Sequence, residues 1–236
     1  MSVKEAKKAA MKAHGYLSGP EGELLYRLAR NCCGRGVIVE IGSWKGRSTI
    51  WLAFGSREGT GRKIIAVDPH VSYSEMPTGN SFREFRQNLK NAGVEEMVEP
   101  VVKTSEEAAR GFKEKVEFVF IDGNHSYEHT KQDFELWFPK VEEHGVMAFH
   151  DTMLVPGPKK VVHDLVFNSR HFRNIGFVDS ITFAEKVKGN TAMERMKNRQ
   201  ALLLKGLFML ASRLNIAVGL PKPLKSFGKK AIGKMQ

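Results

Sequence analysis

Short hydrophobic runs alternate with amphipathic segments along most of this chain, and this alternation constrains the fold more than any other feature. Runs rich in β-branched and aromatic residues predict strands at 36–41, 63–68, 101–102, 116–121 and 145–150. Helical patterns are found at 21–33, 46–54, 82–92, 127–138 and 160–168, and another helix opens at Ser105. Strands separated by helices form right-handed βαβ units, which build a mostly parallel sheet with helices on both faces.

Two more β-like runs, 174–178 and 181–186, lie too close together for a helical crossover. We expect them to form an antiparallel hairpin at one end of the sheet. The predicted fold is therefore α/β: a Rossmann-like, doubly wound sheet of seven strands with a C-terminal antiparallel hairpin. Residues 21–186 are the predicted domain, residues 1–20 an N-terminal basic helix, and residues 187–236 a basic amphipathic tail.

The net charge of +11 is concentrated at one end of the chain. Residues 186–236 hold twelve Lys or Arg residues and one acidic residue, Glu194, so this segment alone has a charge of +11. The preceding domain is neutral. An alkaline isoelectric point would suggest a nucleic-acid-binding protein, but the charge belongs to the tail and not to the domain.

Cysteine usage and the N-terminus indicate a cytoplasmic protein. Cys32 and Cys33 are adjacent, and neighbouring cysteines rarely form a disulfide with each other. The first fifteen residues are charged and lack the long apolar core of a secretory signal. The chain contains no run of 18 or more uncharged apolar residues, so we expect no membrane-spanning helix.

The first strand ends in a glycine-containing loop that suits a ligand. Gly42 and Gly46 allow the backbone to approach a bound molecule and allow a helix to start close to the strand. A dinucleotide fingerprint would need further glycines at the positions of Trp44 and Arg47, and a phosphate loop of the Walker type would need four residues between its glycines. Both are excluded by the spacing.

Acidic residues mark the ends of the first two strands. Glu40 lies in the last part of the first strand, and Asp68 ends the second. An acid at the second position accepts hydrogen bonds from ribose hydroxyls in nucleoside-binding Rossmann folds. Together the two acids favour binding of a nucleoside over the alternative that both merely cap strand ends in solvent.

Four segments of the chain together resemble the class I methyltransferases of the "methyltransferase domain 24" type, relatives of catechol and macrolide-sugar O-methyltransferases. They are VEIGSWKGRST (39–49), AVDP (66–69), FVFIDGNHSYE (118–128) and GVMAFHD (145–151). The resemblance covers about residues 16–186 and implies that S-adenosylmethionine is the cofactor. It implies that Thr104, Ser105 and Glu106 lie near the adenine. The predicted cofactor site comprises Glu40, Gly42, Ser43, Gly46, Asp68, Ser105 and Asp122.

A second group of polar residues ends the fourth and fifth strands. Asp122 and His125 follow one strand, and His150 and Asp151 follow the next. Because these strands are neighbours in such a sheet, we expect the four side chains to converge. Carboxylates suit Mg²⁺, and imidazole shifts the preference toward Mn²⁺. The predicted metal ligands are Asp122, His150 and Asp151.

Catalysis is assigned to His125 and His150, with His125 as the general base. In the catechol-type relatives, residues matching Asp122, His150 and Asp151 hold Mg²⁺, and a lysine matches His125. Histidine has an ordinary pKa near 6.5, which suits proton transfer at neutral pH. The chain departs from these relatives at the metal site, where a histidine–aspartate pair replaces an acid–amide pair.

The basic tail and one loop provide the remaining expectations. Residues 70–80 are predicted to form a substrate-facing lid. Residues 191–220 read as an apolar helix, followed by a lysine-rich end. Such a segment suits an anionic membrane surface, which would make the protein peripheral on the inner membrane face. The alternatives are a helix that packs on the domain and a helix that joins protomers into a homo-oligomer; nucleic acid is the weaker candidate.

The sequence therefore predicts an O-methyltransferase that acts on a sugar, glycan or small-metabolite hydroxyl. A metal-dependent hydroxylase or oxygenase on the same fold is one alternative, since two histidines and a carboxylate also bind iron. A non-catalytic membrane or RNA adaptor is the other, although the intact cofactor residues argue against it.

Overall fold

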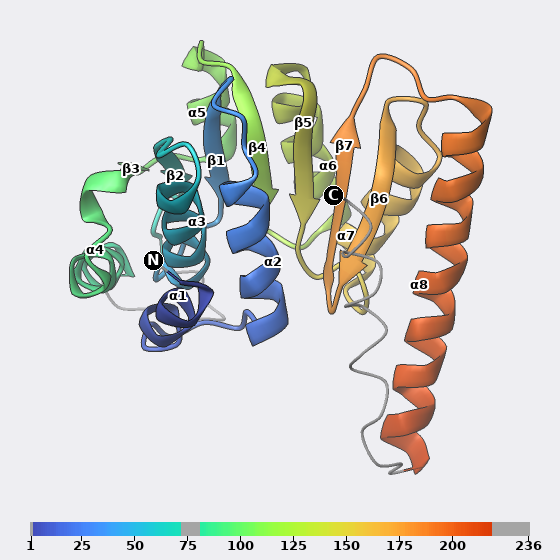
Figure 1. Ribbon diagram of the computed structural model, residues 1–236, viewed down its shortest axis with the longest axis horizontal. Helices are drawn as coiled ribbons and strands as arrows, with labels where there is room; N and C mark the ends of the chain where they lie inside the picture. Colours follow the sequence, from blue (N-terminus) through green and yellow to red (C-terminus); the bar gives the residue numbers. More distant parts are fainter. Residues whose placement is uncertain (1, 72–80, 219–236) are drawn as a thin grey trace.

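The structure is a computed structural model that describes residues 2–71 and 81–218, with side chains through residue 211. Seven strands form one sheet in the order β3-β2-β1-β4-β5-β7-β6 (Figure 1). They are β1 (Val37–Ile41), β2 (Ile64–Val67), β3 (Val98–Val101), β4 (Val116–Ile121), β5 (Val141–Phe149), β6 (Phe172–Val178) and β7 (Ile181–Lys186). β1 to β5 are parallel, and β7 is antiparallel to both β5 and β6. The predicted sheet and its hairpin are confirmed.

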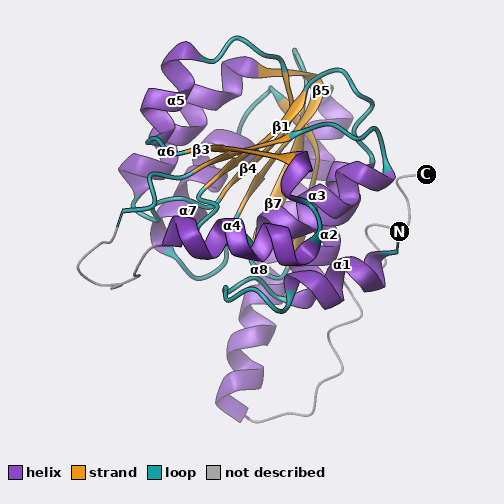
Figure 2. Cartoon of the chain, turned by 90° about the vertical axis from the view of Figure 1, so that its left-hand side faces the viewer, coloured by secondary structure: helices purple, strands orange, loops and turns teal. Residues whose placement is uncertain are grey.

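Helices cover both faces of the sheet, as the alternating pattern predicts (Figure 2). They are α1 (Val3–Ala10), α2 (Gly19–Arg30), α3 (Arg47–Glu58), α4 (Ser81–Ala92), α5 (Ser105–Gly111), α6 (Tyr127–Trp137), α7 (Pro156–Val161) and α8 (Ala192–Val218). Within β1, Ile38 packs into one core cluster with Trp51 of α3, and Val39 packs into the other with Trp137 of α6. Successive strand residues point to opposite faces, so each strand contributes to both cores.

The connections diverge between β1 and β4. The chain proceeds from β1 through β2 to β3 on one side of this point, and from β4 to β5 on the other. Ligands of open α/β sheets bind at such a switch point, in the crevice beyond the carboxyl ends of the strands. The sequence motifs that follow β1 and β4 therefore meet at one location.

The N-terminal helix is shorter than expected. It ends at Ala10, where a helix through residue 20 was predicted. After the helix, the Arg47 guanidinium donates hydrogen bonds to the carbonyl oxygens of Ala13 (2.8 Å) and Leu17 (3.3 Å). Ala6, Ala10 and Ala13 are buried in the core cluster that contains Trp51, so this segment packs on the domain.

Three element boundaries also differ from the sequence predictions. β3 begins at Val98, and its predicted residue Val102 is half exposed beyond its end. β5 begins four residues before the predicted Gly145. The helix predicted at 160–168 begins at Pro156 as α7, because proline suits the first turn of a helix, and it continues as a π-helical turn over Val162–Phe167.

Helix α8 runs along the β6 edge of the sheet, and its C-terminal part extends beyond the sheet (Figure 1). One side of the helix is anchored to the domain. Asn198 Nδ2 donates to the carbonyl oxygen of Phe172 (2.9 Å), and Phe208 contacts the ring of Phe177. Lys205 is buried, so its side chain is withdrawn from solvent; the sequence placed this lysine within the predicted basic amphipathic tail.

No helix in the described ranges has the length and apolar character needed to cross a membrane. Most of the predicted substrate-facing loop, residues 72–80, lies outside the described residues, as does the lysine-rich end at 219–236. His70, at the start of that loop, is described. Its Nδ1 lies 3.2 Å from Ser81 Oγ, and its ring contacts Phe82 and Phe85.

Candidate functional site

The loop between β1 and α3 requires glycine at Gly42. Its φ is +87°, and a Cβ atom there would lie 2.2 Å from the carbonyl oxygen of Asp122. No other residue fits between the ends of β1 and β4 without moving the backbone. Gly46, with φ of +85°, then starts α3. The predicted cofactor loop therefore lies directly against the end of β4.

Asp68 is held by backbone amides on both of its oxygens. The amide of Trp44 donates to Oδ2 (2.8 Å), and the amide of His70 donates to Oδ1 (2.6 Å). Both donors have positive φ values, 40° for Trp44 and 51° for His70, which are uncommon for residues other than glycine. The backbone thus orients a carboxylate whose remaining lone pairs can accept hydrogen bonds from a ligand.

Two buried polar atoms beside the Gly42 loop have no hydrogen-bond partner among the described residues. They are Glu40 Oε1 and Ser43 Oγ. Glu40 Oε2 accepts a hydrogen bond from Thr49 Oγ1 (2.5 Å). Burial raises the pKa of Glu40 to about 8, and Asp122 and Asp68 add to this shift. Buried polar groups are normally satisfied, so these two atoms are available to hydrogen-bond a polar ligand.

The hydroxyls at the start of α5 already have protein partners. Trp137 Nε1 donates to Ser105 Oγ (2.9 Å), and Thr104 Oγ1 accepts from the amide of Glu107 (3.2 Å). Thr104 therefore caps the helix. Ser105 Oγ already accepts a hydrogen bond from Trp137, and its role in cofactor binding stays a prediction.

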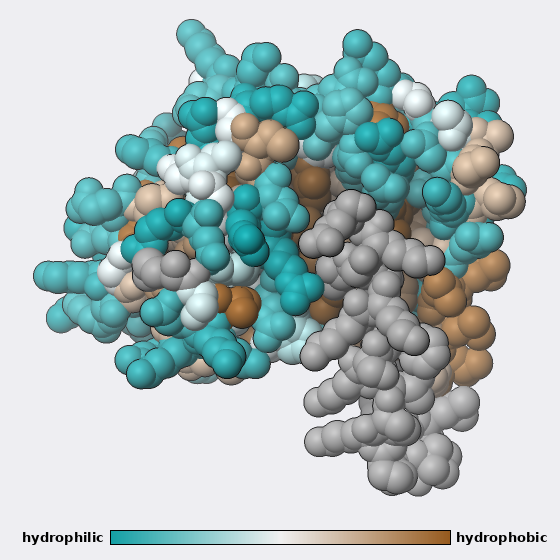
Figure 3. Space-filling model, in the orientation of Figure 1, coloured by the Kyte–Doolittle hydropathy of each residue, from teal (hydrophilic) through white to brown (hydrophobic). Residues whose placement is uncertain are grey.

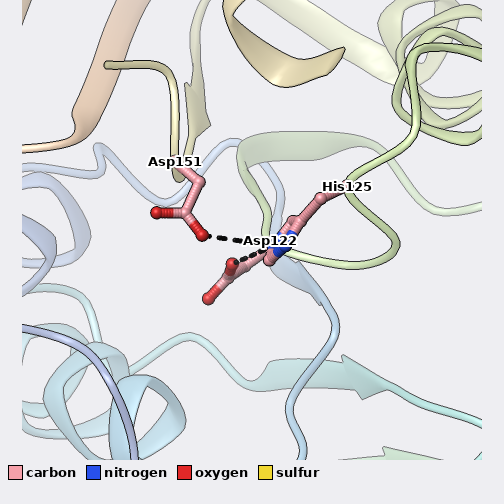
Figure 4. Close-up of side chains that lie close together, drawn as sticks. All are labelled: Asp122, His125 and Asp151. Atoms are coloured by element: carbon pink, nitrogen blue, oxygen red, sulfur yellow. Dashed lines mark ion pairs between the residues drawn. The ribbon is translucent and has the colours of Figure 1, made fainter. Parts of the chain in front are cut away.

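Asp122, His125 and Asp151 converge at the carboxyl ends of β4 and β5 (Figure 4). His125 Nε2 lies 3.5 Å from Asp122 Oδ1 and 3.4 Å from Asp151 Oδ2. The ligand atoms of the three residues all lie within 4.8 Å of one another, a spacing that can hold a metal ion. Asp151 has φ of +55°, so the turn after β5 adopts an unfavourable conformation that directs this carboxylate.

His150 lies behind this cluster and is nearly buried. Its Nδ1 is 3.2 Å from Asp122 Oδ1 and 3.4 Å from Asp151 Oδ2. These are ion-pair distances, but neither contact has the geometry of a hydrogen bond, and Nδ1 has no hydrogen-bond partner among the described residues. The opposite nitrogen, Nε2, faces Glu21 Oε2 at 3.6 Å and Ser180 Oγ at 3.3 Å.

Glu21 is a site residue that the sequence analysis missed. It was assigned only to the start of a helix, and its amide does form a cap with Ser18 Oγ (3.3 Å). Its Oε1 also accepts hydrogen bonds from the amide (2.8 Å) and hydroxyl (2.6 Å) of Ser180. A capping motif was visible in the sequence, but no local signal connects α2 to a hairpin turn 159 residues away.

The electrostatics of the cluster depend on these close carboxylates. Burial alone would lower the pKa of His150, but Asp122, Asp151 and Glu21 together raise it to about 12. Burial alone would raise the pKa of Glu21, but His150 and Ser180 lower it to about 2. Asp122 raises the pKa of His125 against the opposing effect of burial. The surrounding carboxylates thus favour the protonated form of the buried His150 ring.

All four residues expected at the ends of β4 and β5 therefore meet, but in two layers. Asp122, His125 and Asp151 form the accessible layer, and His150 forms the buried layer. The His125 side chain is 44% exposed, and the His150 side chain is 7% exposed. The predicted metal set named His150 and left out His125. In the structure the set with the required spacing contains His125, because the loop after β4 turns it back over Asp122.

Comparison with known proteins identifies methyltransferases as similar to the central part of the chain. The model of a methyltransferase-domain family matches residues 39–152, the segment that contains the Gly42 loop, Asp68 and the Asp122–Asp151 cluster. An uncharacterized protein of Acanthamoeba polyphaga mimivirus is 24% identical over 141 residues, covering 54% of this chain and 59% of that protein. The chain spans less than two thirds of the length of the curated relatives that it matches.

Solved structures share the fold at low sequence identity. The O-methyltransferase TomG from Streptomyces achromogenes, in complex with S-adenosylmethionine, has a TM-score of 0.55 and 19% identity, with 78% of this chain and 89% of that chain covered. An O-methyltransferase from Bacillus cereus, in complex with S-adenosylhomocysteine, has a TM-score of 0.57, 20% identity and the same coverage. Residues 39–152 thus match a methyltransferase-domain family, and the chain shares its fold with these O-methyltransferases.

Proposed function

We propose that this protein transfers a methyl group from S-adenosylmethionine to a hydroxyl group of a small-molecule or sugar acceptor. The observation that carries the proposal is the cluster of Asp122, His125 and Asp151 at the carboxyl edge of the sheet, directly beside the Gly42 loop. A proton acceptor and a cofactor loop at one switch point suit transfer to an oxygen nucleophile.

The residues around Gly42 fit the cofactor. The unpartnered atoms Glu40 Oε1 and Ser43 Oγ offer polar contacts, and Asp68 offers a preoriented carboxylate for the ribose hydroxyls. When bound, S-adenosylmethionine supplies an electrophilic methyl group on a positively charged sulfur. The protein's contribution is to hold the acceptor oxygen in line with that methyl group and to exclude competing geometries.

His125 Nε2 is the proposed proton acceptor. Its Nε2 would accept the proton of an acceptor hydroxyl held beside the cluster. Asp122 and Asp151 lie 3.5 Å and 3.4 Å from this nitrogen, so they stabilise the imidazolium that results. His150 contacts both carboxylates from the buried side, and Glu21 contacts His150.

The same side chains fit a divalent cation. His150 Nδ1 is buried without a hydrogen-bond partner and lies beside two carboxylates, while its other nitrogen faces Glu21. Metal-binding histidines commonly have such a carboxylate on the second ring nitrogen. Asp122, His125 and Asp151 would hold the ion, with His150 Nδ1 beside both carboxylates. A cation at this place would lower the pKa of a bound acceptor hydroxyl.

Calorimetric titration with S-adenosylmethionine, followed by an assay of S-adenosylhomocysteine release with catechols and sugars as acceptors, tests the proposal. We expect cofactor binding without acceptor, and product formation with at least one hydroxyl acceptor. Absence of S-adenosylmethionine binding would overturn the proposed function. Activity that is unchanged after exhaustive EDTA treatment would exclude the metal ion and leave methyl transfer intact.

A further inference from the structure

Exposed large apolar side chains are concentrated on helix α8. Eleven such residues occur in the described part of the chain, and six of them lie on this helix. These are Met193, Met196, Leu203, Leu204, Leu207 and Leu210. Leu203 and Leu207 are 69% and 63% exposed. We call these six residues the outer face of α8; the space-filling view shows apolar side chains along the helix at the right-hand side of the molecule (Figure 3).

The outer face is opposite the side that holds the helix on the domain. Asn198 and Lys205 are buried on the inner side, where Lys205 Nζ donates to Thr152 Oγ1 (2.9 Å) and Thr182 Oγ1 (2.7 Å). With 3.6 residues per turn, positions 203, 207 and 210 point away from positions 198 and 205. Within the described residues, the outer face therefore has no partner, and the helix has apolar residues exposed along its length.

Charge decides which partner fits this face. Lys197 and Arg199 are exposed and lie at the two borders of the outer face. The segment 186–236 holds twelve basic residues and one acidic residue. A second copy of the chain would bring two such cationic segments together, which like-charge repulsion opposes. An anionic lipid surface satisfies both the apolar face and the cationic borders.

We propose that the outer face of α8 docks the protein on an anionic lipid surface, with the helix lying in the interface. Asp122 follows β4 and Asp151 follows β5, whereas α8 lies beyond β6 at the sheet edge. Docking through the outer face therefore leaves the carboxyl edge of β4 open to an acceptor.

Flotation of the full-length chain with lipid vesicles tests this proposal. The wild-type protein is expected to bind vesicles of phosphatidylcholine that contain phosphatidylglycerol, to bind pure phosphatidylcholine weakly, and to lose binding as salt is added. The Leu203→Glu/Leu207→Glu variant is expected to lower the partition coefficient by about tenfold or more, because it places charges within the apolar contact.

Lys113→Glu is the matched control, because it changes the net charge by the same amount at an exposed position away from α8. It should retain vesicle binding apart from the effect of net charge. Thermal unfolding and S-adenosylmethionine binding, expected to be unchanged in both variants, show that the fold is intact. Equal binding of both vesicle types would overturn the proposal, and so would equal binding by the two variants. A dimer that the leucine variant dissociates, with no vesicle binding by wild type, would assign the face to a second copy instead.

Discussion

At the scale of single residues, Asp68 shows how the backbone prepares a side chain for a ligand. Two amides from residues with positive φ hold its carboxylate, so part of its hydrogen-bonding capacity is used before any ligand arrives. The remaining lone pairs of this oriented carboxylate can accept hydrogen bonds from a ligand. This geometry supports the sequence-based assignment of Asp68 to ribose recognition, which stays a prediction.

Asp68→Ala is expected to weaken S-adenosylmethionine binding by about 1.5–3 kcal/mol, the range for losing charge-assisted hydrogen bonds. Isothermal titration calorimetry measures the change. Asp68→Asn is the control, since it retains an oxygen that can accept the amide of Trp44 while removing the charge. Wild-type affinity in the alanine variant would remove Asp68 from the cofactor site.

The two histidines of the cluster should respond differently to mutation. His125→Ala is expected to lower kcat by about 10²-fold or more with little effect on cofactor binding or stability, because its side chain is accessible and acts on the reacting hydroxyl. His150→Ala leaves Glu21 buried without its counter-charge and should lower the free energy of unfolding by about 3–5 kcal/mol. Turnover assays and chemical denaturation separate the two effects; a His125 variant with normal turnover would move the proton acceptor elsewhere.

At the scale of secondary-structure elements, α8 and the β6–β7 hairpin are joined by a buried amine. Lys205 reaches from the helix to Thr152, the residue after Asp151, and to Thr182 of β7. Thr152 Oγ1 also donates to the carbonyl oxygen of Ser180 (2.7 Å), whose hydroxyl contacts Glu21. A chain of polar contacts thus links α8, the hairpin turn and α2 behind the candidate site.

Lys205 should make stability depend on pH. Burial, with a further effect from Lys159, lowers the pKa of Lys205 from 10.5 to about 7. Between these values the unfolded chain binds more protons than the folded protein, so stability rises with pH across this window. Burying the charged amine lowers the free energy of unfolding, and this cost is fully present below pH 7. At about 1.4 kcal/mol per pKa unit it amounts to several kcal/mol, and it disappears toward pH 10.5.

Lys205→Met therefore should raise Tm relative to wild type most at pH 7 or below, and this advantage should shrink toward pH 10. The hydroxyls of Thr152 and Thr182 hydrogen-bond to each other (2.7 Å), so they keep a partner when the amine is removed. Lys197→Met, at an exposed position of the same helix, is expected to show no such trend. A Tm difference for Lys205→Met that is constant across pH would contradict the lowered pKa.

At the scale of the whole molecule, the segment that the sequence assigned to a basic amphipathic tail contributes to the packing of the domain. Asn190 Nδ2 and Asn198 Nδ2 both donate to the carbonyl oxygen of Phe172, and Ala201 and Leu202 pack on the core cluster that contains Phe172. The sheet edge formed by β6 is therefore covered by the helix. An uncovered edge strand exposes backbone groups that favour aggregation.

Truncation after Gly189 is expected to lower Tm by more than about 5 °C and to promote aggregation, since it removes these contacts. Truncation after Val218 retains the whole of α8 and should keep the wild-type Tm, which makes it the matched control. Differential scanning fluorimetry and light scattering measure both. If the shorter protein keeps its Tm and binds S-adenosylmethionine, the tail is a separable element after all.

The sequence by itself determined the sheet, the order of its strands along the chain and the position of the cofactor loop. These follow from the hydrophobic period and from residues that come directly after a strand, such as Gly42 after β1 and Asp68 after β2. Asp122 and Asp151 could also be predicted to meet, because β4 and β5 are parallel neighbours.

Only the tertiary structure decided the rest. The pairing of Glu21 with His150 and the burial of Lys205 against Thr152 and Thr182 join elements that are distant in sequence. A lysine in a basic helix and a glutamate in a capping motif look like surface residues in the sequence, since local pattern reports helix periodicity and not which side of a helix meets another element. That choice depends on packing of the whole chain, and it made the inner side of α8 part of the domain while leaving its outer face exposed.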